Sequence, residues 1–226
     1  MNENYTHMIS KIPLFDGIRE EDIQGMLICL GGCIKKYNKD EFIIMKDENV
    51  NIVGIVLDGS VRMIREDLWG NRVTIVSMGE NELFGETFSC RKDGNATVSF
   101  VAGTATTILT VQFRKVMNSC SNSCAFHHRL IENMVTLIAE KNVILMDKVD
   151  ILSKKTIREK ISTYLIQQSM KNESKYFDIP LGRVQLAEFL NVDRSSLTRE
   201  LNNMRDEGLI DFDRNSFHML KNLEQI

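Results

Sequence analysis

Two short helices joined by a tight bend are predicted between Arg183 and Leu201, in the segment RVQLAEFLNVDRSSLTREL. An apolar stripe marks the inner face of the first helix: Leu186, Ala187 and Leu190. The second helix begins after Asp193, a residue type that is favoured at N-cap positions. Its apolar residues recur at i, i+4 and i+7, which is a helical spacing: Leu197, Leu201 and Met204. The apolar faces of the two helices can therefore pack against the protein core, and their outer faces remain exposed for binding.

The outer face of the second helix carries guanidinium and hydroxyl groups near its start: Arg194, Ser195, Ser196, Thr198 and Arg199. Arginine pairs with guanine O6 and N7 in the DNA major groove, and hydroxyl groups reach phosphates or base edges. Two solvated surface helices without a ligand are the alternative interpretation. We favour DNA recognition for three reasons. The polar residues lie on the side opposite the apolar stripe, the apolar residues have helical spacing, and the residues between the helices suit a tight bend.

This segment resembles the winged helix-turn-helix of the CRP/FNR family of bacterial transcription regulators. The shared elements are L-A-x-x-L in the first helix, N-V-D at the bend and D-R-S-S-L-T-R in the second helix. The resemblance implies that Arg194 and Arg199 make the main base or phosphate contacts. It places three further DNA-binding residues beside them: Arg183, Ser195 and Ser196. Many relatives carry glutamate where Ser195 stands, so we expect a different half-site. Two β runs in GLIDFDRNSFHML resemble the family's wing.

From about Cys33 to Phe113 the apolar residues alternate between closely spaced turn signals, which predicts an antiparallel sandwich or barrel. The segments LDGSVRMI and MGENELFGE resemble the cyclic-nucleotide-binding jelly roll of the same family. We therefore expect an α+β chain that begins with an antiparallel β jelly roll. The predicted domains are an effector or sensor jelly roll over 1–126, a dimerisation helix over 127–153 and a winged helix-turn-helix over 154–226.

A long helix is predicted from His127 to Leu152. Its apolar positions recur in alternating steps of 4 and 3: Ile131, Val135, Ile138, Asn142, Leu145, Val149 and Leu152. This spacing is typical of a coiled-coil seam, in which Asn142 falls at an a position and would fix the register. A single amphipathic helix packed on its own barrel is the alternative. Because a helix-turn-helix that reads a palindrome needs a twofold partner, we favour a homodimer.

The segment Phe84-Gly85-Glu86-Thr87 matches the phosphate-binding cassette of relatives that bind a cyclic nucleotide. The glycine would let backbone amides approach an anion, and Glu86 is suited to accept a hydrogen bond from a ribose hydroxyl. Cyclic AMP receptors add a phosphate-neutralising arginine and a polar pair that reaches the base. These align here with uncharged pairs: Ala96-Thr97 and Val143-Ile144. We therefore expect a different small molecule, or none, instead of cyclic AMP; a purely structural turn at residues 84–86 is the alternative.

The cysteines support a competing hypothesis, a redox, metal or haem sensor on the same scaffold. If the segment is helical, three side chains could share one face and hold zinc or haem iron: Cys120, Cys124 and His127. Buried thiols without a functional role are the alternative. We find no nucleophile–base pair and no two-metal carboxylate cluster in the sequence, so we do not expect a nucleotide-acting enzyme.

The chain has 28 basic and 31 acidic residues, a net charge of −3, and from Lys155 onward 11 basic residues balance 11 acidic ones. DNA contacts must then come from the local arginine cluster, and two half-sites must reinforce a weak single contact. No apolar run reaches the roughly 18 residues needed to cross a bilayer, so we expect a cytoplasmic protein without membrane contact. Activation of transcription would add RNA polymerase as a partner.

Overall fold

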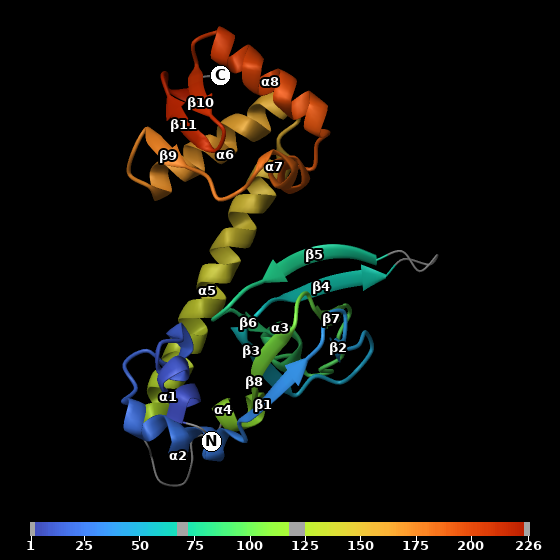
Figure 1. The fold of residues 1–226 in the computed structure, drawn as a ribbon, viewed down its shortest axis with the longest axis vertical. Helices are drawn as coiled ribbons and strands as arrows, with labels where there is room; N and C mark the ends of the chain where they lie inside the picture. Colours follow the sequence, from blue (N-terminus) through green and yellow to red (C-terminus); the bar gives the residue numbers. More distant parts are fainter. Residues whose placement is uncertain (1–2, 67–71, 118–124, 224–226) are drawn as a thin grey trace. The chain divides into compact units, whose positions relative to one another are not determined.

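The computed structural model describes residues 3–66, 72–117 and 125–223. The chain forms two compact units, Met1–Ile138 and Ala139–Ile226, and the long helix α5 (Ala125–Ser153) contributes to both. The first unit is built on antiparallel sheets and the second contains a helix-turn-helix (Figure 1). The predicted α+β fold class is therefore confirmed.

Two four-stranded antiparallel sheets form the jelly roll of the first unit (Figure 1). The first sheet has the order β1-β8-β3-β6 and contains β1 (Cys33–Tyr37), β8 (Thr106–Gln112), β3 (Ile52–Asp58) and β6 (Leu83–Phe84). The second has the order β2-β7-β4-β5 and contains β2 (Phe42–Ile44), β7 (Ser99–Ala102), β4 (Val61–Glu66) and β5 (Arg72–Met78). Nearly every residue of β3 and β8 is buried, because these central strands are covered on both faces.

Helices close one end of the jelly roll and share a core with it. They are α1 (Glu3–Ser10), the 3₁₀ turn η1 (Pro13–Phe15), α2 (Glu20–Leu30), α4 (Phe113–Met117) and the first half of α5. A further short helix, α3 (Glu86–Ser89), follows β6. Leu130 and Met134 of α5 are buried in this core together with Phe15 and Leu109. One face of α5 is therefore fixed within the first unit.

The second unit packs three helices against a three-stranded antiparallel sheet. The helices are α6 (Ile157–Lys171), α7 (Arg183–Leu190) and α8 (Arg194–Asp206), and the sheet has the order β10-β11-β9. Its strands are β9 (Tyr176–Asp178), β10 (Ile210–Asp213) and β11 (Ser216–Met219). The predicted wing is the β10–β11 hairpin, in which Asp213 pairs with Ser216. Strand β9 was not predicted, because three residues between helices carry too short a pattern.

Within the described part of the chain, no helix is both long enough and apolar enough to cross a membrane.

Candidate nucleic-acid interface

Helix α7 and the bend that follows it have the local structure that their residues predict. Asn191 takes a left-handed conformation, with φ of 51°, at the C-cap of α7. The amide of Val192 donates to the carbonyl of Ala187 at 3.0 Å, which closes the bend. Leu186, Ala187 and Leu190 are buried in the core of the second unit. The small Ala187 side chain, 4% exposed, lies where helix packing leaves little space.

Helix α8 begins after Asp193, as predicted, but the Asp193 carboxylate makes no capping hydrogen bond. The backbone carbonyl of Asp193 instead accepts from the amide of Leu197 at 2.9 Å. The apolar residues at i, i+4 and i+7 are all buried: Leu197, Leu201 and Met204. Burial of this stripe fixes which side of α8 faces outward.

The outward side of α8 presents a polar, cationic surface. Its side chains line an open hollow: Arg194, Ser195, Thr198, Arg199 and Asn202. Among the described residues, neither the Arg194 nor the Arg199 guanidinium forms an ion pair, and both side chains are exposed. Ser196 is half-buried beside them. Asn202 was not among the predicted residues; it lies one further turn along the same face and accepts a hydrogen bond from Arg205 at 3.2 Å.

Arg183 has a different environment from the arginines of α8. Its guanidinium carbon lies 4.9 Å from the ring centroid of Phe212 and 5.1 Å from that of Phe217, so it stacks against the wing. Burial lowers the pKa of Arg183, and its Nη1 atom has no hydrogen-bond partner among the described residues. To contact a phosphate, this side chain would have to leave the aromatic stack.

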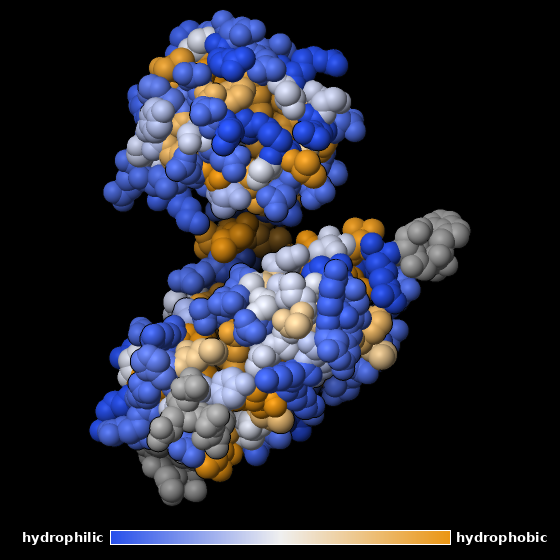
Figure 2. All heavy atoms as spheres, in the orientation of Figure 1, coloured by the Kyte–Doolittle hydropathy of each residue, from blue (hydrophilic) through white to orange (hydrophobic). Residues whose placement is uncertain are grey.

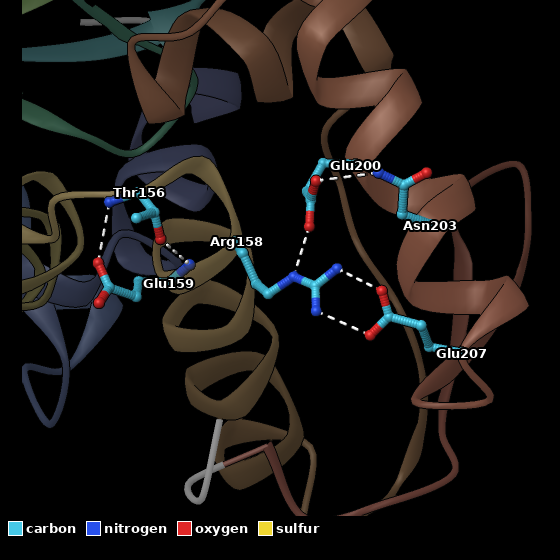
Figure 3. Close-up of polar contacts among 6 residues, drawn as sticks. All are labelled: Thr156, Arg158, Glu159, Glu200, Asn203 and Glu207. Carbon is cyan, nitrogen blue, oxygen red and sulfur yellow. Dashed lines mark hydrogen bonds and ion pairs between the residues drawn. The ribbon is translucent and has the colours of Figure 1, made fainter.

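Helix α6 supports both helices of the helix-turn-helix with basic side chains that the sequence interpretation missed. The Lys160 Nζ donates to the carbonyl of Leu190 at the end of α7, at 3.2 Å. Arg158 forms ion pairs with Glu200 of α8 and with Glu207, its C-cap residue (Figure 3). The only sequence signal was the pair of glutamates seven residues apart on a helix whose opposite face is basic.

The four predicted cassette residues lie at the β6–α3 junction of the jelly roll. Phe84 is 1% exposed and its ring covers Gly54, where an added Cβ would lie only 2.2 Å from the ring. Gly85 takes a φ of 82° and leads into α3, so the glycine is required by the backbone. Glu86 is buried, and Thr87 is exposed.

The positions that align with the other cyclic AMP contacts offer no cation and no polar pair. Ala96 is buried and Thr97 is exposed. The nearby Arg91 pairs with Asp93 through two hydrogen bonds of 2.8 and 3.0 Å. On α5, Val143 and Ile144 are 57% and 64% exposed and are both apolar.

Two protein-family models match separate parts of the chain. A cyclic nucleotide-binding domain covers residues 34–123, and a Crp-like helix-turn-helix domain covers residues 159–226. The Cyclic AMP receptor protein of Thermus thermophilus is 25% identical over 198 residues, which are 88% of this chain and 88% of that protein. Together, the two models and this relative support a transcription regulator of the CRP/FNR type.

Solved structures of CRP/FNR type share the fold. The catabolite activator protein of Thermus thermophilus matches with a TM-score of 0.52 and 22% identity, over 94% of this chain and 95% of that one. A CooA mutant from Carboxydothermus hydrogenoformans matches with a TM-score of 0.60 and 18% identity, over 89% of each chain. At these identities the similarity shows a shared fold. It does not identify the ligand of the sensor domain, which must be inferred from that domain's own residues.

The seam predicted on the long helix of this CRP/FNR chain is largely exposed. Ile131 is half-buried, Ile138 is 36% exposed, and the later seam residues are more open: Asn142, Leu145, Val149 and Leu152. Val135 is 59% exposed. Figure 2 shows hydrophobic surface on the middle of α5. Exposed apolar faces of this kind are typical of interaction surfaces.

The metal hypothesis falls mostly outside the described residues. Cys120 and Cys124 lie there, whereas His127 is described and is 2% exposed. In the described ranges, no group of three or more His, Cys, Asp or Glu residues is arranged to hold a metal ion. Partial burial, and then the charge of Glu86, raise the pKa of Cys90, which makes its thiol less prone to ionise.

Proposed function

We propose that this CRP/FNR protein acts as a homodimer that binds a palindromic operator, with one α8 helix in each major-groove half-site. The observation that carries the proposal is the outer face of α8, where exposed Arg194 and Arg199 stand beside serine and threonine hydroxyls. Arginine reads guanine bidentately, and hydroxyl groups reach phosphates. Two such helices in a dimer would enter grooves roughly 34 Å apart.

The exposed seam of α5 supports the homodimer. Leu145 and Val149 are 59% and 58% exposed, although their side chains are apolar. A second copy of α5 would cover them, with Asn142 paired across an a position. We accordingly assign residues 127–153 to dimerisation, 1–126 to effector sensing and 154–226 to DNA binding.

Selection of DNA fragments from a random pool tests this function. We expect the full chain to enrich a sequence with inverted half-sites whose centres are separated by 10 to 11 base pairs or a multiple of that spacing, because one helical turn separates the two recognition helices. Enrichment is measured by sequencing, and the bound stoichiometry by light scattering of the complex. Recovery of no preferred sequence, or of a single half-site by one copy, would contradict the proposal.

We further propose that the sensor domain responds to a molecule other than cyclic AMP, or to none. The relative from Thermus thermophilus is named as a cyclic AMP receptor, but this chain has Ala96-Thr97 and Val143-Ile144 where cyclic AMP receptors place their phosphate and base contacts. A buried phosphate without a guanidinium partner loses a charge-assisted pair. The nearby Arg91 pairs with Asp93, so it would have to leave that carboxylate to bind a phosphate.

Cyclic AMP at 1 mM is expected to leave both the melting temperature and the operator affinity unchanged. A ligand present at a hundred times its dissociation constant would stabilise the protein by about 2.7 kcal/mol, which corresponds to a shift of roughly 5 to 10 °C for a chain of this size. Differential scanning fluorimetry and calorimetry measure the effect, with a cyclic AMP receptor protein as positive control. A clear thermal shift together with tight calorimetric binding would refute this prediction.

A further inference from the structure

Arg158, in the first turn of α6, binds two glutamates: Glu200 of α8 and Glu207, the C-cap residue of that helix (Figure 3). Its Nε atom donates to Glu200 at 2.5 Å, and its two terminal nitrogens donate to the two carboxylate oxygens of Glu207 at 2.7 and 2.6 Å. The guanidinium is thus used in a fork that binds one carboxylate bidentately and a second from the side. This geometry is stronger and more directional than that of an ordinary surface ion pair.

The first turn of α6 is stabilised by its own hydrogen bonds, so the backbone that carries Arg158 is held in position. Thr156 and Glu159 form a capping box: the Thr156 Oγ1 accepts from the amide of Glu159 at 3.1 Å, and the Glu159 carboxylate accepts from the amide of Thr156 at 2.9 Å (Figure 3). These hydrogen bonds lower the pKa of Glu159. A cation in the first turn of a helix is unfavourable against the helix dipole, so Arg158 depends on its acidic partners.

The two glutamates are placed so that one side chain can set the rotation of α8 about its axis. Glu207 is the C-cap residue of α8 and keeps a right-handed helical conformation. Seven residues are almost two helical turns, so Glu200 and Glu207 lie on the same side of the helix. Glu200 directly follows Arg199, and its side chain is only 21% exposed. Because side chains reach about 5 to 6 Å from a helix axis, a rotation of 20° would move the outer arginines by about 2 Å. Recognition sites tolerate errors of only about 0.5 Å.

We propose that Arg158 is a positioning residue for operator recognition: by binding Glu200 and Glu207 it fixes the rotation of α8, and with it the direction of Arg194 and Arg199, without contacting DNA. This inference rests on the proposed function, because it concerns how the same surface is presented. The pairing also has an electrostatic effect, since it neutralises two carboxylates close to a surface that meets phosphates. The experiment must separate these two effects.

Arg158→Met retains the aliphatic stem and removes the fork. In the full chain, we expect its affinity for the selected operator to fall about tenfold or more, while its affinity for unrelated DNA changes less than about threefold. Arg158→Lys, which keeps the charge but loses the bidentate geometry, should lie between Arg158→Met and the wild type. Lys154→Met is the matched control, because Lys154 is similarly exposed and, within the described ranges, forms an ion pair with Asp150 alone, at 2.9 Å. Its operator affinity should not change.

The triple variant Arg158→Met, Glu200→Gln, Glu207→Gln separates position from charge. If Arg158 positions α8, the triple variant should lose operator specificity as Arg158→Met does, although the two carboxylates that would repel DNA phosphates have been replaced by amides. Recovery of wild-type specificity in the triple variant, or unchanged specificity in Arg158→Met, would overturn the inference.

Should Arg158→Met fail to fold, Arg158→Lys and Glu207→Gln provide the measurement. A reduced ratio of operator to unrelated binding in both supports the inference, and an unchanged ratio in both overturns it. If the wild-type chain selects no sequence at all, the proposed function is wrong, which is a result distinct from the failure of any Arg158 variant.

Discussion

Arg194→Ala and Arg199→Ala are each expected to abolish specific operator binding while the dimer remains intact. Each well-placed bidentate arginine contributes about 1 to 3 kcal/mol of discrimination between bases, and a homodimer loses the contact in both half-sites. The combined loss is about 2 to 6 kcal/mol, which is roughly thirtyfold to more than ten-thousandfold in affinity. Gel shifts and fluorescence anisotropy with the selected operator measure it.

The dependence of affinity on salt distinguishes a base contact from a phosphate contact. Loss of a phosphate contact reduces the slope of log affinity against log salt by about 1 per site and weakens all sequences alike, whereas loss of a base contact relaxes the preference at one position. Lys171→Ala is the control, since it removes an exposed positive charge near the end of α6 and leaves α8 unchanged. Unchanged sequence preference in both arginine variants would refute the assignment.

The helix-turn-helix could be predicted from the sequence because its information is local. The apolar spacing of Leu197 and Leu201, the αL-tolerant Asn191 and the arginines beside them all lie within one short segment. The pairing of Arg158 with Glu200 and Glu207 joins residues 42 and 49 positions apart, and no short pattern encodes such a contact.

Arg183 illustrates a second limit of sequence reasoning. Its position at the start of the unit matches a DNA contact in the family pattern, yet its guanidinium stacks on Phe212 and Phe217. An arginine that is free to point outward and one held by aromatic rings have the same sequence signature. Only the fold of the wing over α7 distinguishes them.

The long helix buries some of its apolar residues in its own two units and leaves others exposed. In the first unit, Leu130 and Met134 pack into the core beside the jelly roll, as expected of an amphipathic helix on its own barrel. In the second unit, Ile151 is buried in the core of the winged helix-turn-helix. Leu145 and Val149 belong to neither core and remain exposed. The helix therefore has one set of apolar residues for its own units and an exposed set, which the proposed homodimer would cover.

Val149→Asp is expected to dissociate the dimer and, with it, to remove operator binding. Val149 falls at an a position of the seam, so the substitution would place an unpaired carboxylate from each copy in the apolar contact. A buried unpaired charge costs several kcal/mol, and both copies contribute, so the dimer dissociation constant should rise at least about a thousandfold. Analytical ultracentrifugation measures the association directly.

Val143→Asp is the matched control for this substitution. Val143 is 57% exposed and Val149 is 58% exposed, and both are valines on the same helix, so the two changes have the same cost in helix propensity and in solvent exposure. They differ in position, because Val143 lies at b, outside the seam, in the register that places Val149 at a. A chain that dimerises along this seam must therefore respond to one aspartate and tolerate the other. Equal association of the two variants would show that the apolar face of α5 is not the dimer contact, and the twofold reading of an operator would then need another interface.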